Sequence, residues 1–463
     1  MALHDVLLQG LAGLHLLVAG AMVVDLLRQH RSPAATLAWI AILLLLPWLG
    51  ILLYVLAGAP RKRSAALVEY FAAHAVATPA APPASCPDTE RLLRALGLPA
   101  ATRGNAVQLC RRNEDAADEL LRLIGAARQR LLLSVFSFEA DAAGERILAA
   151  MRERAAAGVQ VRMLVDGYGS LHLSAPSLQA LQAAGGRLAR YRPLVHAGSI
   201  RGAFNYRNHR KMVIADGAEV WIGGRNLALK YLATLPDGSQ WADLSLVVDG
   251  PAAALFESVF RSDWLTATGE ALSGAPVRDP APPRGDSCVQ VLASGPDLPD
   301  DTLHATLLAG IIGARQRVWI VSPFFVPDDA LLSALLLACR RGLDVRIIVP
   351  RRSNMWLADH VRTSYVEQVA AAGGQVLLFE PGVLHAKIVV LDARVAMVGS
   401  ANFDMRSLFT NHEITAVLYS AADIAAVAAV VEAFATQATA SGRAEGFATT
   451  ALSGALRIIA PLL

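Results

Sequence analysis

The chain has 463 residues, more than a single hydrophobic core usually holds, so two globular bodies and an additional segment are expected. Hydrophobic residues make up 54% of it, and its formal net charge is only +3. Because this small charge is dispersed, we expect no nucleic-acid partner held by a basic patch. The cysteines form no CxxC pair, so neither a zinc site nor a redox motif is expected; they are Cys86, Cys110, Cys288 and Cys339.

Two apolar runs open the chain. Val6–Leu27 contains one charged residue, Asp25, and Ser32–Pro60 contains none. Each run is long enough to cross a bilayer, which takes about 20 residues. A cleaved signal peptide is disfavoured, because the start lacks basic residues and a second run follows at once. We therefore predict a transmembrane helical hairpin over residues 1–60, with spans at 6–27 and 35–57.

Two further features of this hairpin concern its shape and orientation. Pro47 lies inside the second span and is expected to kink it. Arg61, Lys62 and Arg63 follow the second span, and no basic residue precedes the first. This bias favours a cytoplasmic position for the rest of the chain.

Stretches rich in proline and alanine divide the remainder. They lie at residues 78–87 and 274–285 and are typical of linkers. The apolar run at 65–76 fits either the bilayer surface or core packing, and both readings stay open. The predicted organisation is a membrane-proximal helix and linker at 61–104, a first domain at 105–273, a linker at 274–286, a second domain at 287–440, and a tail at 441–463 that is a candidate for membrane contact.

The two domains repeat each other. Ala127–Arg130 and Ala314–Arg317 have the same sequence, and each precedes an apolar run. An amphipathic helical segment and a Gly-x-x-Val-Arg turn into a strand then follow in both. Helices alternating with buried strands indicate α/β layers in each domain.

The third shared feature carries chemical groups. The first copy reads His209-x-Lys211-x4-Asp216-x6-Gly223-x2-Asn226, and the second reads His385-x-Lys387-x4-Asp392-x6-Gly399-x2-Asn402. The chain has only four lysines, and two of them fall at these equivalent positions. Since residues i and i+2 of a strand face the same side, each His and Lys pair is expected to point into one cavity.

This set of groups suits the cleavage and re-formation of a phosphodiester. Fixed positive charge and amide donors stabilise the phosphoryl oxygens, and two imidazoles divide the roles of nucleophile and acid. A metal ion is disfavoured, because each lysine ammonium opposes a cation in the same cavity. No metal and no cofactor are therefore expected.

His209, Lys211 and Asp216, with His385, Lys387 and Asp392, resemble the paired HKD motifs of the phospholipase D superfamily, and these six residues are the predicted catalytic set. Within the superfamily the chain is similar to the bacterial cardiolipin synthases, on the run Asn205–Lys211, on Ala38-Trp39 and Leu46-Pro47, and on the closing Ala460–Leu463. The resemblance implies an α/β fold of two pseudo-symmetric phospholipase D-like domains with mixed sheets flanked by helices, behind the two-helix anchor.

The resemblance also implies roles for single residues. His209 is expected to be the nucleophile and His385 the acid and then the base, an assignment that pseudo-symmetry makes reversible. Asp216 and Asp392 are expected to organise the site rather than react. The expected phosphate-binding residues are Lys211, Asn226, Lys387, Ser400 and Asn402, with Gly224 in place of the serine in the first copy. The expected histidine-orienting residues are Glu413 and its first-copy counterpart Asp243.

The implied reaction moves a phosphatidyl group from one phosphatidylglycerol to another, giving cardiolipin and glycerol through a phosphohistidine. The expected partners are phospholipid substrates and the bilayer, and the expected location is the bacterial cytoplasmic membrane, with more than one span. A phospholipase that transfers to water, another phosphatidyltransferase and a nuclease are alternatives with the same chemistry. A catalytically inactive membrane scaffold is the alternative of a different class. Donor and acceptor lipid, and oligomeric state, stay open.

Overall fold

The computed structural model describes residues 3–28, 33–58, 64–73, 87–171, 173, 175–193, 206–235, 239–272 and 283–441. Most of both predicted linkers and all but the first residue of the predicted tail at 441–463 lie outside these ranges. Contacts divide the chain into two compact units. One comprises Met1–Lys62 and Arg192–Arg207, and the other comprises Arg63–Tyr191 and Asn208–Leu463.

The N-terminal unit contains three helices, α1 (Leu3–Leu27), α2 (Pro33–Leu45) and α3 (Leu49–Ala57). Among the described residues, one helix is long and apolar enough to cross a membrane, from Asp5 to Leu27 within α1. The second predicted span, 35–57, is not one helix, because the chain breaks between α2 and α3. At 1.5 Å per residue neither of these shorter helices covers the roughly 30 Å of a bilayer core.

The break has a local cause at Pro47. Proline has no N–H to donate, and its ring clashes with the carbonyl four residues earlier, so α2 cannot continue. Trp48 turns the chain with a φ of 61°, and α3 then packs against α2. Gly50 permits the approach, since a Cβ there would overlap the carbonyl oxygen of Ile42. Asp25 of α1 accepts a hydrogen bond from the Tyr54 hydroxyl at 3.0 Å, which gives this charge a partner.

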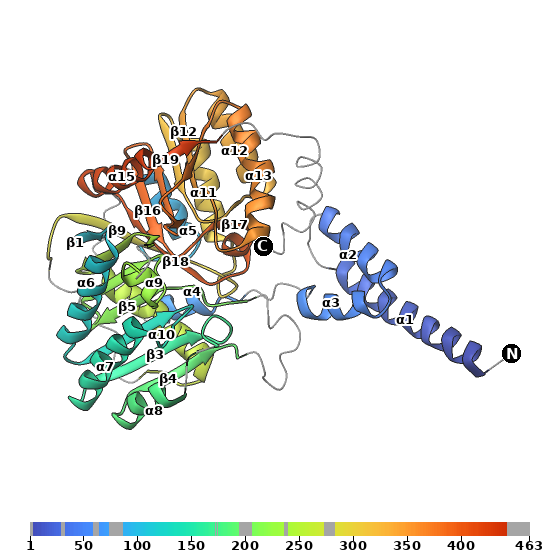
Figure 1. Cartoon of the computed structure of the whole chain (residues 1–463), viewed down its shortest axis with the longest axis horizontal. Helices are drawn as coiled ribbons and strands as arrows, with labels where there is room; N and C mark the ends of the chain where they lie inside the picture. Colours follow the sequence, from blue (N-terminus) through green and yellow to red (C-terminus); the bar gives the residue numbers. More distant parts are fainter. Residues whose placement is uncertain are drawn as a thin grey trace. The chain divides into compact units, whose positions relative to one another are not determined.

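The larger unit contains both repeats (Figure 1), which appear in cyan to green and in yellow to red. The first half comprises, in chain order, α4 (Ala66–Ala73), α5 (Pro87–Ala95), β1 (Thr102–Cys110), α6 (Asn113–Ala126), β2 (Arg130–Val135), α7 (Ala142–Ala156), β3 (Gln160–Asp166), α8 (Ala175–Ala183), β4 (Arg187–Tyr191), β5 (Met212–Ala215), β6 (Glu219–Gly223), α9 (Leu229–Leu232), β7 (Trp241–Ala242), β8 (Ser245–Asp249) and α10 (Ala252–Thr268).

The second half follows the same plan. It comprises β9 (Ser287–Ser294), α11 (Thr302–Gly313), β10 (Arg317–Val321), β11 (Phe325–Val326), α12 (Asp329–Arg340), β12 (Asp344–Pro350), α13 (Trp356–Ala371), β13 (Gln375–Phe379), β14 (Val383–Leu384), β15 (Ile388–Leu391), β16 (Val395–Gly399), β17 (Phe403–Asp404), α14 (Met405–Phe409), β18 (Glu413–Leu418), α15 (Ala421–Thr436) and β19 (Ala438–Ala440).

The two half-sheets are joined into one 15-stranded sheet with the order β19-β13-β12-β10-β15-β16-β18-β9-β1-β8-β6-β5-β2-β3-β4. β2, β3 and β4 are parallel, as are β10, β12 and β13, and antiparallel strands lie between these groups. Most side chains of the inner strands, such as β2, β5, β10 and β16, are buried on both faces because helices cover the sheet, whereas the outer strands β4, β13 and β19 are partly exposed. The α/β fold with two mixed, helix-flanked halves is therefore confirmed.

The helix that follows the anchor packs into this body. Leu67 of α4 is fully buried, and α4 contacts α10. The amides of Ser64 and Leu67 donate to the carbonyls of Pro296 and Asp297. For the described part of the apolar run at 65–76, core packing is the reading that the structure supports.

Candidate active site

The first half-site lies at the start of β5, where His209 and Lys211 precede Met212. The His209 amide donates to the His412 carbonyl at 2.9 Å, so the second half of the chain holds this segment. Nδ1 of His209 lies 2.9 Å from both carboxylate oxygens of Glu413. The ring of Phe136, just after β2, meets the imidazole edge-on at a centroid distance of 5.0 Å.

The second half-site lies at the start of β15. The His385 amide donates to the Ala242 carbonyl at 2.7 Å, and Nδ1 of His385 lies 2.7 Å from Oδ2 of Asp243. Two aromatic rings pack on this imidazole, those of Tyr231 at 5.1 Å and Trp241 at 5.6 Å. Both histidines are buried, so their ring orientations are fixed by packing and by the carboxylates.

The carboxylates are exchanged between the halves. Glu413 of the second half serves His209, and Asp243 of the first half serves His385. Their equivalence follows from register, because Gly223 pairs with Ser245 and Gly399 pairs with Thr415, each two residues after the acidic one. The short β7–β14 pairing and the Asn208–His412 bridge join the halves next to these groups. Both motifs therefore contribute to one centre.

Burial and mutual repulsion set the charges in this centre. Burial lowers the pKa of His209 to about 4, with Lys211 and Lys387 acting in the same direction and Glu413 against them. Burial and then Lys387 lower the pKa of His385 to about 3. Burial lowers the pKa of Lys211 to about 7 and that of Lys387 to about 8. Both imidazoles are therefore neutral at pH 7 when no substrate is bound.

The two lysines sit differently beside their histidines. Lys211 Nζ donates to the His209 carbonyl at 2.8 Å and lies over the Phe136 ring. Lys387 Nζ donates to the His385 carbonyl and lies 3.0 and 3.1 Å from the ring nitrogens of the same histidine. Lys387 and Asn402 line a small cavity of about 20 Å³. The second half-site thus couples its ammonium and imidazole directly.

The two motif asparagines occupy different surroundings. Asn226 accepts from the Ser137 amide and donates to the Tyr231 hydroxyl, both at 3.2 Å. Through Tyr231 it supports the ring that packs on His385. The Asn402 amide oxygen is buried without a hydrogen-bond partner among the described residues, next to Lys387 in the cavity. This unpaired atom is an acceptor, so it fits a ligand hydroxyl, whereas a phosphoryl oxygen would need the side-chain NH2 group.

The hydroxyl of Ser400, a predicted phosphate-binding residue, is engaged by neighbouring groups of the protein. Its hydroxyl donates to Glu413 and accepts from the Ile414 amide at 3.0 Å, so it holds the carboxylate that orients His209. In the first half the equivalent residue is Gly224, where a Cβ would overlap the Asp243 carboxylate. The Asp243 side chain instead accepts from its neighbour, the Leu244 amide, at 2.7 Å. The two halves hold their carboxylates by different means.

Asp216 and Asp392, predicted as catalytic, lie away from the histidines at the far ends of β5 and β15. Asp216 accepts from three successive backbone amides, those of residues 128 to 130, at 2.7 to 2.8 Å. Asp392 binds the amides of residues 315 to 317 in the same way. Both have a φ of 55°, which Asp tolerates better than most residues. They anchor the turn between two strands, and the catalytic assignment is corrected to a structural one.

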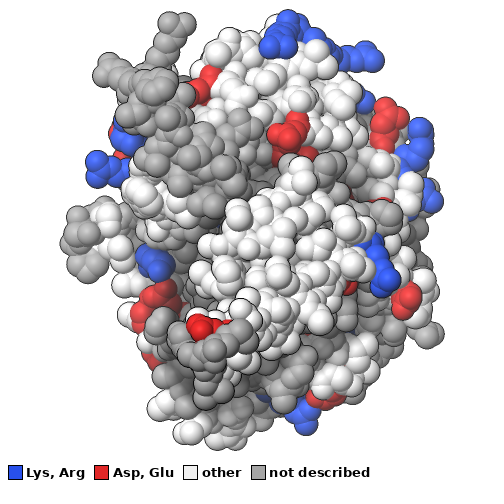
Figure 2. Space-filling model, turned by 90° about the vertical axis from the view of Figure 1, so that its right-hand side faces the viewer, with Lys and Arg blue, Asp and Glu red and all other residues white. Residues whose placement is uncertain are grey.

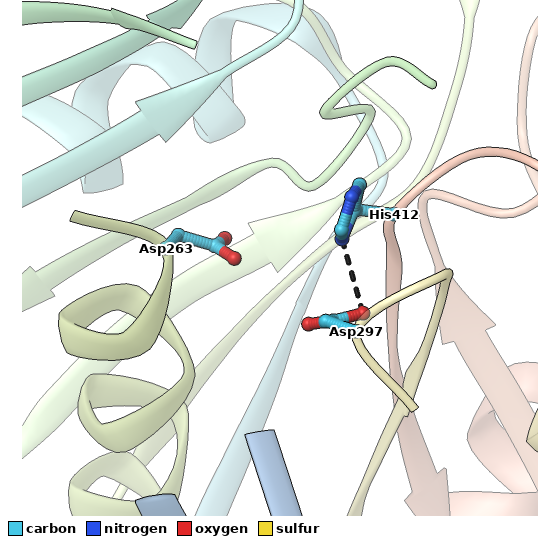
Figure 3. Close-up of side chains that lie close together, drawn as sticks. All are labelled: Asp263, Asp297 and His412. Carbon is cyan, nitrogen blue, oxygen red and sulfur yellow. Dashed lines mark ion pairs between the residues drawn. The ribbon is translucent and has the colours of Figure 1, made fainter. Parts of the chain in front are cut away.

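A buried ionic network behind the first half-site was missed from the sequence. Arg210 lies between His209 and Lys211, and its guanidinium binds Asp263, Asp297 at 2.9 Å and the Glu413 carbonyl at 3.1 Å. Figure 3 shows Asp263, Asp297 and His412 together, with an ion pair of 3.0 Å between Asp297 and His412. Although burial raises it, Arg210 and His412 lower the pKa of Asp297.

These three side chains also have the spacing of metal ligands, with donor atoms within 4.8 Å of one another. The Arg210 guanidinium, however, already binds both carboxylates. A cation there would face this fixed positive charge. The set fits a structural ion network that supports His412 and Glu413, not a metal centre.

Two repeated halves with paired His and Lys groups define a phospholipase D-like protein. Comparisons with known proteins agree. A family model described as "Cardiolipin synthase, PLD-like domain" matches residues 120–264 and 307–436, and one described as "Phospholipase_D-nuclease N-terminal" matches residues 17–58. Cardiolipin synthase 1 of Bacillus cereus is 32% identical over 84% of this chain and 81% of its own length. Cardiolipin synthase A of Pseudomonas aeruginosa (strain LESB58) is 34% identical over 87% of this chain and 84% of its own length.

The chain therefore belongs to the cardiolipin synthase family of phospholipase D-like proteins. Among solved structures, phosphatidylserine synthase of Haemophilus influenzae matches with a TM-score of 0.61 and 14% identity. The match covers 81% of this chain and 100% of that one, and at this identity it supports the fold alone.

Proposed function

We propose that this chain is a phosphatidyltransferase that makes cardiolipin, moving a phosphatidyl group from one phosphatidylglycerol to a hydroxyl of a second and releasing glycerol. The observation that carries the proposal is the exchanged pairing of two buried imidazoles with carboxylates of the opposite half, beside two lysines. The similarity to cardiolipin synthases along most of the chain supports the lipid substrate.

His209 is the proposed nucleophile. Glu413 accepts the Nδ1 proton, so the neutral ring keeps its lone pair on Nε2. In the first step, Nε2 attacks phosphorus, an N–P bond forms and the bond from phosphorus to the glycerol oxygen breaks. In the second step, the oxygen of the second phosphatidylglycerol attacks, and the N–P bond breaks.

His385 is the proposed acid and then base. It gives a proton to the departing glycerol and takes one from the incoming hydroxyl, so the cycle is balanced. Because Lys387 Nζ touches the ring nitrogens, the imidazole and the ammonium titrate as one coupled pair that holds the required proton. The negative charge of a bound phosphodiester favours transfer of this proton from Lys387 to the His385 imidazole.

The phosphoryl oxygens are assigned to Lys211 and Lys387, with the remaining side-chain amide hydrogens of Asn226 and Asn402. Fixed donors in a buried centre stabilise the charge that develops in the transition state more strongly than water does. A bulky lipid acceptor that excludes water from this centre favours transfer over hydrolysis.

Membrane attachment is part of the proposal. The span within α1, with α2 and α3 beside it, would hold the enzyme in the cytoplasmic membrane where both lipids reside. If α2 and α3 together pass through the bilayer, the chain crosses the membrane twice. If they do not, only the span within α1 crosses it.

A nuclease with the same chemistry is a weaker candidate. On the face drawn in Figure 2, Lys and Arg side chains stand in small separate groups with acidic side chains among them. Binding of a nucleic-acid backbone uses a continuous basic surface. The described residues drawn there form no such surface.

Product analysis tests the proposal. Purified full-length protein in vesicles of phosphatidylglycerol is expected to produce cardiolipin and free glycerol in equal amounts, measured by lipid mass spectrometry and a glycerol assay. Phosphatidate without cardiolipin would show hydrolysis instead and refute transfer. Adding phosphatidylethanolamine to the vesicles tests the donor, since ethanolamine release would identify it as a second donor.

A further inference from the structure

The body of the enzyme exposes few large apolar side chains, and they are not scattered evenly. Among the described residues of the larger unit, seven are exposed: Tyr168, Leu171, Leu265, Ile312, Leu337, Met355 and Trp356. Three of them stand singly on α10, α11 and α12. The other four lie in two loops, residues 167–171 and 351–356. Exposed apolar residues that gather in this way mark a contact surface more often than isolated ones do.

The two loops occupy equivalent places in the repeats. Loop 167–171 follows β3, and loop 351–356 follows β12 and includes the first residue of α13. β3 is parallel to β2, and β12 is parallel to β10. The carboxyl ends of parallel strands meet at one edge of a sheet, where binding sites form. In each half this is the edge that carries the histidine.

Contacts connect the first loop to the active centre. Asp166, the last residue of β3, accepts from the amides of Tyr168 and Asn208, and Asn208 immediately precedes His209. The Ser170 hydroxyl donates to the carbonyl of Phe136, the residue whose ring packs on His209. In the second half, β12 contacts β14, which leads directly into His385.

The backbone of each loop is fixed while its apolar side chains point outward. Ser170 also accepts from the Phe138 amide at 3.0 Å, yet Tyr168 and Leu171 are 52% and 50% exposed. In the other loop the Ser353 amide donates to Asp359 at 2.8 Å, yet Met355 and Trp356 are 41% and 67% exposed. Hydrogen bonding therefore rigidifies a conformation that leaves four apolar groups uncovered.

We propose that these two loops form a membrane-docking surface that places the mouth of the active centre on the lipid headgroups of an anionic bilayer. Trp and Tyr favour the interface between headgroups and hydrocarbon, and Leu and Met insert more deeply. Exposed Arg352, in the same loop as Met355, adds a charge that anionic lipids attract. The inference rests on the proposed function and adds the surface through which the lipid enters.

Paired substrates separate docking from chemistry. The full-length protein, with its anchor, is assayed on phosphatidylglycerol in vesicles and on dihexanoyl phosphatidylglycerol below its critical micelle concentration. For the double variant Tyr168→Ser with Trp356→Ser, KM expressed as mole fraction in the vesicles is expected to rise about fivefold or more. Its kcat, and turnover of the short-chain lipid, are expected to stay within twofold of the parent.

Two further double variants serve as controls. Ile312→Ser with Leu337→Ser removes side chains of similar exposure, 53% and 52%, from helices α11 and α12. This variant is expected to leave both assays unchanged. Tyr168→Leu with Trp356→Leu keeps apolar groups in the loops and is expected to retain most vesicle activity.

The possible results of these assays distinguish failure of the docking surface from failure of the proposed function. An unchanged KM in vesicles overturns the docking surface while leaving the proposed function intact. An equal loss on both substrates, or a change in oligomeric state, assigns the loops to folding or to a second copy and also overturns it. Absence of cardiolipin from the parent protein on either substrate instead refutes the proposed function.

Discussion

At the scale of single residues, the two half-sites are equivalent in position but not in detail. Ser400 holds Glu413 by a hydrogen bond, whereas Gly224 leaves room for the Asp243 carboxylate. Arg210 stands between His209 and Lys211, and Ala386 takes its place in the other copy. Both histidines have a carboxylate and aromatic neighbours, but a buried ionic network backs the first, and two aromatic rings pack on the second.

Gly224 provides a test of this asymmetry. In Gly224→Ala the new methyl group is expected to displace Asp243 from His385 and to lower kcat about 100-fold, since an acid or base that loses its orienting partner loses most of its contribution. Steady-state kinetics measures the loss, and a melting curve checks the fold. The matched variant Gly313→Ala, where a Cβ meets nothing within 4 Å, should behave as the parent. Equal activity of the two variants would contradict the role of Gly224.

The buried lysines predict the pH profile of kcat/KM. A lysine loses its charge as pH rises through its pKa. Phosphate binding by Lys211 and the proton that Lys387 shares with His385 should therefore be lost as the pH rises through about 7 to about 8. The nucleophilic imidazole is neutral above its pKa, so activity should fall as pH drops through about 4. Initial rates on short-chain phosphatidylglycerol give the profile. In Lys211→Arg the guanidinium stays charged, so the alkaline limb should move to higher pH, and a limb that does not move would refute the assignment.

At the scale of elements, hydropathy located the anchor, and the kink expected at Pro47 is a complete break in the helix. The run at 35–57 is apolar throughout, yet Pro47 and Trp48 split it into α2 and α3. Likewise, the identical Ala-Arg-Gln-Arg segments and the motif aspartates lie far apart in the sequence, which gives no sign that they meet. In the structure they form one hydrogen-bonded unit, in which a carboxylate binds the three amides at the start of β2 or β10.

Substitution of either aspartate in this hydrogen-bonded unit is expected to reduce stability rather than catalysis. Asp216→Asn and Asp392→Asn keep a side chain that tolerates the positive φ but remove the charge that the amides share. Each is expected to lower the free energy of unfolding by about 1–2 kcal/mol, from weakened charge-assisted hydrogen bonds. The kcat of the folded protein should stay within about threefold of the parent. Loss of turnover at unchanged thermal stability would restore the catalytic assignment.

At the scale of the whole molecule, neither half is complete alone. Glu413 and His209 are 204 positions apart, and Asp243 and His385 are 142 positions apart, yet each pair shares a hydrogen bond. The two histidines should therefore behave as one unit, and either His→Ala change is expected to remove nearly all transfer, with little further loss when both are combined.

A donor with a good leaving group separates the two roles. With phosphatidyl-p-nitrophenol the first step needs no acid, so His385→Ala and Asp243→Asn should release a burst of nitrophenolate equal to the enzyme and then stall. His209→Ala should give no burst, and Glu413→Gln a slow one. Stopped-flow absorbance measures the burst, and mass spectrometry locates the lipid adduct. The reverse pattern would exchange the assigned roles of the two histidines.

The sequence by itself determined the apolar anchor segment, the repeat, the α/β class and the principal members of the site. These depend on hydropathy, periodicity and spacing, which are local properties of the chain. Only the tertiary structure decided which carboxylate serves which histidine, that Asp216 and Asp392 lie far from the chemistry, and that Arg210 joins a buried network. These facts depend on how the halves pack against each other, and packing brings together residues whose separation along the chain carries no signal of contact.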